Sequence, residues 1–339
     1  MPKQGINFNL YEGNGQPLSH RNQTLPDCNW MPTAPKTYTA SDGLRDAVNV
    51  AVSLGQPLLL TGEPGTGKTQ LAFSVAHELE LPLFEFYTKT TSVAKDLFYE
   101  YDTLSHFQDA HTPGIPLIKQ KYVTYNAFGK AILLACTPNE CQKYNPEQSQ
   151  FIPNELKQTP SRSVVLIDEI DKAPRDLPND ILNDILTMSF TVKETTISHQ
   201  AESIYRPIII LTSNSEKNLP EPFLRRCVYY HIDFPDDERL TTIIKNHMGE
   251  LSDFMVTLLP KALDHFRDIR NKALKKPPAT AELITWLDVL ASILDDPHID
   301  FNNLTPAQES KLAISYTVLA KYKDDLDQLL PKKQEVLSK

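Results

Sequence analysis

Short apolar runs mark the middle of the chain, and stretches of helical periodicity lie between them. The runs occupy residues 57–61, 82–87, 164–167 and 208–212. Each is short and largely apolar, which is typical of a strand buried in a parallel sheet. Residues 68–79, between the first two runs, are predicted to form a helix. Strands that alternate with helices predict an αβα sandwich, in which helices cover both faces of a parallel sheet.

The chain has a different pattern on either side of this region. Residues 1–40 are rich in Asn, Gln, Pro and Gly and show no periodicity, so they are predicted to form an arm or linker. Ser41-Asp42 is typical of a helix start, and four apolar residues follow at helical spacing: Leu44, Ala47, Val48 and Ala51.

Only helical patterns follow Phe234-Pro235. The predicted helices cover residues 236–248, 253–273, 279–294 and 305–329, with breaks at Pro277-Pro278 and Pro297. The sequence therefore predicts an α/β core over 41–235, an all-helical lid over 236–330 and a short tail over 331–339.

Composition excludes several classes of protein. Apolar residues make up 40% and charged residues 23% of the 339 residues, unlike a disordered chain. No run of about 18 apolar residues predicts a membrane span, and no signal peptide is visible, so a cytoplasmic location is expected. The net charge of −9 opposes binding of nucleic acid over most of the surface. The four cysteines lack a CxxC pair, so free thiols in a reducing cytosol are expected rather than a zinc site.

A glycine-rich loop follows the first apolar run and fits the pattern G-x-x-x-x-G-K-[ST]. Its residues are Gly62, Glu63, Pro64, Gly65, Thr66, Gly67, Lys68 and Thr69. Glycines let backbone N–H groups wrap a phosphate, and the following helix adds its dipole. Lys68 would reach the β- and γ-oxygens of a bound nucleotide, and the Thr69 hydroxyl would bind Mg²⁺. The alternative is an ordinary Gly-Pro turn, but the loop lies between a strand and a helix as the chemistry requires.

The third apolar run ends in Asp168-Glu169-Ile170-Asp171. A carboxylate at the tip of a buried strand beside the phosphate loop is suited to hold Mg²⁺, which is the role predicted for Asp168. Glu169 is placed to polarise the attacking water as a general base. An acidic turn without function is the alternative. Asp171 and Lys172 are expected to cap or pair at the start of the following helix.

Two further features suit a site that senses the γ-phosphate. The run 208–212 ends in Ser213-Asn214, and Asn214 is predicted to hydrogen-bond both the attacking water and the γ-phosphate, although Asn is also common in plain turns. Arg225 and Arg226 lie near the end of the core, where they would reach a neighbour's phosphates across a ring interface rather than their own. A solvated surface pair is the alternative.

Together and in this order, these motifs resemble those of the AAA+ superfamily. The residues within and beside each motif resemble its MoxR-like branch. The resemblance rests on residues 57–69, 166–174, 211–214 and 223–227 and covers about 41–295. It implies an αβα P-loop domain with a helical lid, ATP as the nucleotide, and a ring, usually hexameric. It also implies ATP-driven remodelling of partner proteins, often ones with a von Willebrand factor A domain.

By the same resemblance, Arg226 matches the arginine that acts on the neighbouring subunit, and Arg225 is the nearer alternative. Residues 96–127 lie where such ATPases carry a helix-2 insertion, and residues 190–205 would form the hairpin before the sensor strand. Both usually face the axis of the ring, although either is alternatively a plain surface loop.

Two departures from the family pattern stand out. Residues 136–163 form a long polar stretch with no assigned role. Thr280 lies about where the family has its second sensor arginine, and Lys272, Lys275 or Lys276 would supply charge there or form only a solvated turn. The missing arginine favours a second hypothesis, an ATP-binding switch or scaffold with little turnover. A third hypothesis, a nucleic-acid motor, is disfavoured by the charge.

Overall fold

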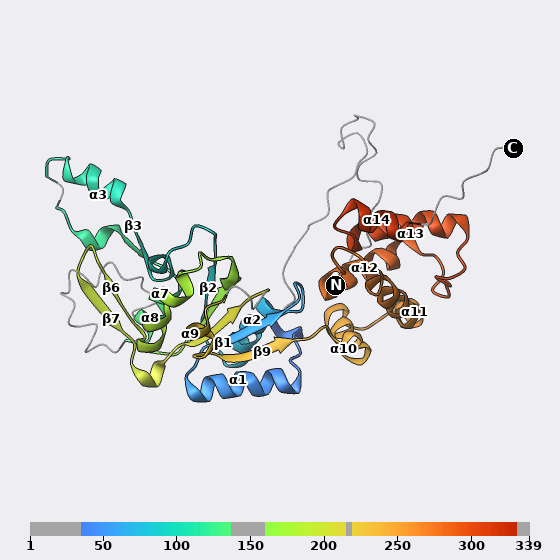
Figure 1. Cartoon of the computed structure of the whole chain (residues 1–339), viewed down its shortest axis with the longest axis horizontal. Coiled ribbons are helices and arrows are strands. Elements are labelled where there is room, and N and C mark those ends of the chain that lie inside the picture. The colour runs from blue at the N-terminus through green and yellow to red at the C-terminus, as the bar shows by residue number, and fades with distance from the viewer. Residues whose placement is uncertain (1–34, 115, 137–159, 215–218, 331–339) are drawn as a thin grey trace. The chain divides into compact units, whose positions relative to one another are not determined.

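The computed structural model describes residues 35–114, 116–136, 160–214 and 219–330 (Figure 1). These residues form two compact units. One unit is Tyr38–Asp233, and the described residues 35–37 and 234–330 belong to the other. The predicted arm up to residue 34, most of the stretch 136–163 and the tail 331–339 lie outside the described residues. Among the described residues, no helix is both long and apolar enough to cross a lipid bilayer.

A parallel sheet forms the centre of the first unit. Its strands are β1 (Leu58–Gly62), β2 (Leu83–Tyr87), β5 (Val164–Asp168), β8 (Ile208–Thr212) and β9 (Val228–Ile232). They are arranged in the order β2-β5-β8-β1-β9, and every neighbouring pair is parallel. The carboxyl ends of the strands therefore meet at one edge of the sheet, which is where open α/β sheets bind ligands.

Helices cover both faces of this sheet (Figure 1). Because side chains alternate along a strand, successive residues of the central strands enter different cores. One core includes Leu58 and Leu60 with side chains of α1 (Asp42–Leu54) and α2 (Lys68–Glu78). The opposite core includes Leu59 with side chains of α4 (Ala127–Leu134), α7 (Leu177–Asp180) and α8 (Leu182–Thr187). The sequence therefore correctly predicts that β1, β5 and β8 are buried on both sides, but the same prediction is wrong for β2, an edge strand with no buried residue.

The strand β9 is an element that the apolar pattern does not predict. Its sequence is Val-Tyr-Tyr-His-Ile, and only Ile232 is buried. As an edge strand, β9 pairs with β1 alone, so it needs no continuous apolar run. Its pairing register places Ile232 beside Gly62, the first residue of the glycine-rich loop.

Two small antiparallel sheets are added to this unit. Strands β3 (Tyr99–Tyr101) and β4 (Val123–Tyr125) pair, and the chain between them forms α3 (Thr103–Ala110), which projects away from the main sheet in Figure 1. Strands β6 (Ser189–Val192) and β7 (Ile197–Gln200) form a hairpin. Phe190 of this hairpin stacks on Tyr99 of β3 at a ring distance of 6.3 Å, so the two additions support each other.

Helices form the described part of the second unit from Asp237 onward. They are α10 (Asp237–Met248), α11 (Asp253–Arg270), α12 (Thr280–Ile293), α13 (Pro306–Leu319) and α14 (Lys323–Leu329). They enclose a core around Trp286, whose indole N–H donates to the Ser315 hydroxyl at 2.9 Å. Elsewhere in the described chain, α9 (Glu221–Leu224) and several 3-10 turns complete the structure: Pro35–Thr37, Ala94–Leu97, Lys119–Tyr122, Ile170–Lys172 and Ser203–Tyr205.

The single helix predicted over 305–329 is wrong, because the chain bends between α13 and α14. Ala320 has an extended backbone, with ψ at 138°. The carboxylate of Asp325 is fully buried and accepts the backbone N–H groups of Lys275, at 2.8 Å, and Lys276, at 3.3 Å. A tertiary contact thus fixes where α14 lies, and no Gly or Pro marks the bend in the sequence.

Candidate nucleotide site at the carboxyl ends of the strands

The loop between β1 and α2 has a backbone that requires glycine. Gly62, Gly65 and Gly67 have φ values of 142°, 80° and 89°, which L side chains rarely adopt. A Cβ atom on Gly62 would lie 2.5 Å from the carbonyl oxygen of Ile232, so a side chain is excluded there. Such a loop, followed directly by a helix N-terminus, is the arrangement in which backbone N–H groups bind phosphate.

Lys68, the first residue of α2, is 7% exposed. Its ammonium donates to the carbonyl oxygens of Gly62 and Glu63, each at 2.8 Å. Burial lowers the pKa of Lys68, and the nearby carboxylates, Asp168 foremost, act in the opposite direction. A polyphosphate in the loop would compensate this buried cation and give it charged partners.

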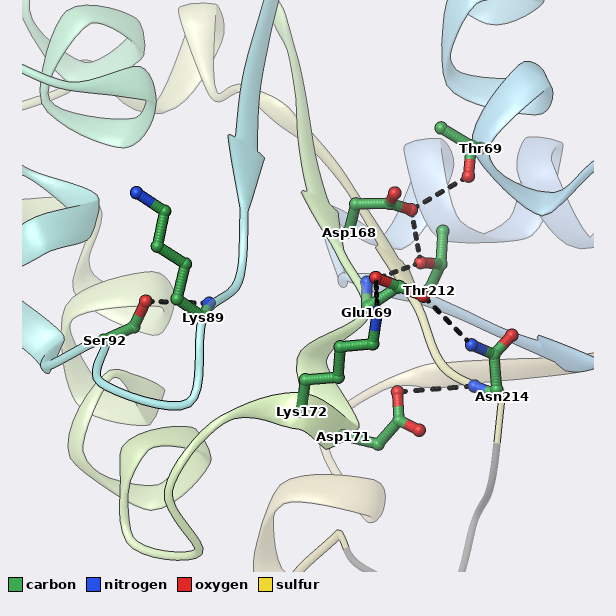
Figure 2. A network of polar contacts seen from close by, with 9 residues as sticks. All are labelled: Thr69, Lys89, Ser92, Asp168, Glu169, Asp171, Lys172, Thr212 and Asn214. Atoms are coloured by element: carbon green, nitrogen blue, oxygen red, sulfur yellow. Dashed lines mark hydrogen bonds and ion pairs between the residues drawn. The ribbon is translucent and has the colours of Figure 1, made fainter. Parts of the chain in front are cut away.

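Asp168, at the end of β5, joins the phosphate loop to the neighbouring strand β8 (Figure 2). Its Oδ1 accepts hydrogen bonds from the hydroxyls of Thr69, at 2.9 Å, and Thr212, at 2.6 Å. Within the described residues, no hydrogen bond reaches Oδ2. Mg²⁺ prefers oxygen ligands such as one or two carboxylates, so the Thr69 hydroxyl and the Asp168 carboxylate fit the metal that accompanies a nucleotide.

Glu169 and Asn214 meet beside this carboxylate, although they leave different strands. Glu169 has a left-handed backbone, with φ at 53°, and its Oε1 accepts from the side-chain amide of Asn214 at 3.2 Å. Non-glycine residues in this conformation concentrate at functional sites. The backbone N–H of Asn214 donates to Asp171 at 3.3 Å. The structure therefore brings together the residues predicted for metal binding, for the base and for sensing.

Lys172 is a member of this cluster that the sequence does not assign to it. Its ammonium forms an ion pair with Oε2 of Glu169 (Figure 2), instead of serving only the start of the next helix. The hydrogen bond to Glu169 raises the pKa of Lys172, so the lysine stays charged at neutral pH. Both oxygens of Glu169 thus have partners, one from Asn214 and one from Lys172.

The variant Lys172→Met should hydrolyse ATP about two- to fivefold faster than the wild type, because exposed ion pairs of this kind have modest energies. The ammonium of Lys172 pairs with the carboxylate of Glu169 and competes with the attacking water for Oε2. The comparison is steady-state turnover at saturating ATP and Mg²⁺. Lys121→Met is the matched control, because its ion pair with Asp109 is similarly exposed but lies in the β3–β4 addition. Slower turnover in Lys172→Met would contradict a restraining role.

The two predicted arginines do not join this cluster. Arg225 pairs with Glu221 on α9, and the guanidinium of Arg226 donates to the carbonyl oxygen of Pro222 at 3.2 Å. Both side chains are exposed. In the described residues, neither arginine contacts the glycine-rich loop of its own chain.

The second unit contains Thr280 and the nearby lysines, which lie about where the family has its second sensor arginine. Thr280 is 7% exposed, and its hydroxyl has no hydrogen-bond partner among the described residues. Lys272, Lys275 and Lys276 are all exposed, and Lys275 pairs with Asp324 at 2.5 Å. Lys275 therefore has a partner within its own unit.

Comparisons with known proteins place the chain in a family. The fold is similar to that of a solved mutant form of RuvB from Thermotoga maritima, with a TM-score of 0.41, 16% identity, and coverage of 84% of this chain and 79% of that one. No curated protein matches the sequence. The model of the ATPase family associated with various cellular activities, AAA, matches residues 58–235, just over half of the chain. The chain therefore belongs to the AAA family.

Proposed function

We propose that this chain binds ATP with Mg²⁺ and hydrolyses it to ADP and phosphate. The observation that carries the proposal is the joint placement of Thr69, Asp168, Glu169 and Asn214 beside a glycine-rich loop with a buried lysine. Mg²⁺ would supply charge neutralisation of the phosphates, with Thr69 and Asp168 as its protein ligands. A cytoplasmic location, expected from the sequence, is part of this proposal.

In this proposal the residues of the cluster divide phosphate binding, proton transfer and orientation of the attacking water among them. The glycine-rich loop and Lys68 bind the phosphates, and Glu169 accepts a proton from the attacking water. Asn214 orients that water and holds the carboxylate of Glu169, which it contacts at 3.2 Å. Because Asn214 leaves the end of β8 and Glu169 leaves the end of β5, a shift between these strands would change hydrolysis.

We further propose that the chain works as a MoxR-type motor in a ring, with six subunits as the expected number. Its work would be to remodel or assemble a partner protein, and proteins with a von Willebrand factor A domain are the first to test. The residue sequences of the motifs support this branch, and so do the two antiparallel additions to the core, at 99–125 and 189–200. A pull-down with a hydrolysis-deficient variant, followed by mass spectrometry, identifies the partner.

The variant Glu169→Gln tests the chemistry separately from nucleotide binding. It preserves the shape of the side chain and the Asn214 contact but removes the base, so hydrolysis should fall on the order of a hundredfold or more. Binding of a fluorescent ATP analogue should persist, since no hydrogen bond or ion pair joins Glu169 to the glycine-rich loop among the described residues. Glu78→Gln, at the exposed end of α2, is the control and should behave as wild type. Normal hydrolysis by Glu169→Gln would require another base, with Asp171 the first candidate.

One observation favours the rival function of a nucleotide-binding switch with little turnover. The residue near the second sensor position is a buried threonine, Thr280, and Lys275 is already paired with Asp324. A lid without a cation for the phosphates would bind ATP yet respond weakly to its hydrolysis. Single-turnover hydrolysis by the purified wild type separates the two functions: a switch would retain bound ATP, and a motor would convert it.

A further inference from the structure

Thr212, the last residue of β8, lies between the two carboxylate residues at the end of β5 (Figure 2). It is 1% exposed, and hydrogen bonds engage its hydroxyl from both sides. The hydroxyl donates to Oδ1 of Asp168 at 2.6 Å and accepts the backbone N–H of Glu169 at 2.8 Å.

These two contacts leave the hydroxyl one orientation. A threonine hydroxyl has a single proton, and here that proton points to Asp168, so a lone pair of the same oxygen faces the N–H of Glu169. The contacts thereby fix the rotation of the Asp168 carboxylate and the backbone of Glu169 at the point where its φ becomes positive. One side chain of β8 thus orients a metal ligand and the residue that carries the base.

The residues at the end of β8 also contact Glu169 at its side chain. Asn214 lies two residues beyond Thr212, and its amide contacts the carboxylate of Glu169. The residue between them, Ser213, is buried, and its backbone N–H donates to the carbonyl oxygen of Leu60 on β1 at 2.9 Å. The exit of β8 is therefore anchored to β1 while Thr212 and Asn214 both reach Glu169.

We propose that Thr212 is a positioning residue, whose hydroxyl aligns Asp168 for Mg²⁺ and Glu169 for the attacking water. This inference rests on the proposed ATPase function. Partners that orient metal ligands typically change metal affinity or activity by about 10- to 100-fold when they are removed. The burial of Thr212 and its two hydrogen bonds give it the features of such a partner.

The test compares Thr212→Val, which keeps the shape and loses the hydroxyl, with Thr212→Ser, which keeps the hydroxyl. We expect Thr212→Val to lower kcat by about 10- to 100-fold with little change in KM for ATP, because the contacts of Lys68 remain. Thr212→Ser should retain kcat within a few-fold. A second measurement avoids turnover: the Mg²⁺ concentration that half-saturates binding of a fluorescent, non-hydrolysable ATP analogue should rise in Thr212→Val and not in Thr212→Ser.

A matched control separates this role from a general effect of removing a buried hydroxyl. Thr88 is also buried, and its backbone N–H donates to the carbonyl oxygen of Asp168 at 3.1 Å, but its hydroxyl has no hydrogen-bond partner among the described residues. Thr88→Val should therefore leave kcat and the Mg²⁺ dependence near wild type. Thermal unfolding reports whether each variant is folded, and Thr212→Ala replaces Thr212→Val if the valine variant does not fold.

Several outcomes would overturn the assignment. One is a folded Thr212→Val protein with the kcat and Mg²⁺ dependence of the wild type. Another is a Thr212→Ser protein as impaired as Thr212→Val. A third is a loss of kcat and Mg²⁺ affinity in Thr88→Val as large as that in Thr212→Val. Failure of the proposed function is a different result, namely a wild type that does not hydrolyse ATP. In that case the Mg²⁺ titration still decides whether Thr212 positions Asp168.

Discussion

The variant Lys68→Ala is expected to bind ATP on the order of a hundredfold more weakly than the wild type and to show no measurable turnover. Removing one partner of a buried, hydrogen-bonded charge pair costs about 2–5 kcal/mol, and Lys68 would form such a pair with the β- and γ-phosphates. Lys68 is 7% exposed, and its ammonium donates to the carbonyl oxygens of Gly62 and Glu63. Isothermal titration with ATP and a phosphate-release assay measure the two effects.

A second lysine at the same edge of the sheet provides the control. Lys89 follows β2 and is exposed, and its side chain points away from the carboxylates in Figure 2. Lys89→Ala removes the same charge from the same end of the domain, so it accounts for any loss of general electrostatic attraction. Full ATPase activity in Lys68→Ala would eliminate the phosphate-loop assignment, whatever the control shows.

The sequence predicts the central strands and the main site residues for a physical reason. Strands buried on both faces must be apolar along their length, so 164–167 and 208–212 are recognisable without any partner. Parallel strands place their carboxyl ends at one edge, which brings the residues that follow them together. Asp168 and Asn214 are 46 positions apart in the chain, by the difference of their numbers, yet both reach the same cluster.

What the sequence does not predict depends on register or on tertiary contacts. From the sequence, Thr212 is recognisable only as a polar residue at the end of a predicted strand. In the structure, the pairing of Ile167 with Leu211 places it opposite Asp168. The sequence assigns Lys172 to a helix start, and the structure shows that it pairs with Glu169 across the short 3-10 turn that follows β5. The bend before α14 likewise depends on the buried carboxylate of Asp325.

Arg226 is the residue whose proposed role needs a second subunit. Arg226→Ala should hydrolyse ATP roughly 10³-fold more slowly than the wild type, since an arginine that completes the transition-state charge has effects of that size in P-loop enzymes. ATP binding should persist, because Arg226 contacts the carbonyl oxygen of Pro222 and not its own glycine-rich loop. Phosphate release and nucleotide binding, measured on the same preparation, separate the two.

Mixing two inactive variants distinguishes action on a neighbour from action within one chain. In a head-to-tail ring each site combines two subunits: one supplies Lys68 and Glu169, and the next supplies Arg226. An Arg226→Ala subunit that receives Arg226 from a Glu169→Gln neighbour has a complete site. Random mixing of equal amounts produces this order at roughly a quarter of the interfaces, so activity should return to at most about that share of the wild type.

The expected recovery depends on exchange of subunits, so exchange is measured first, by energy transfer between differently labelled wild-type preparations. Each variant mixed with itself sets the baseline, because a head-to-tail interface between identical variants always lacks the same group. Recovery above that baseline requires Arg226 to cross an interface, since no single chain in the mixture carries both Arg226 and Glu169. If subunits exchange and the mixture stays as inactive as either parent, Arg226 does not act on the neighbour. Arg225, whose only ion pair among the described residues is with Glu221 on α9, is then crossed with Glu169→Gln in the same way.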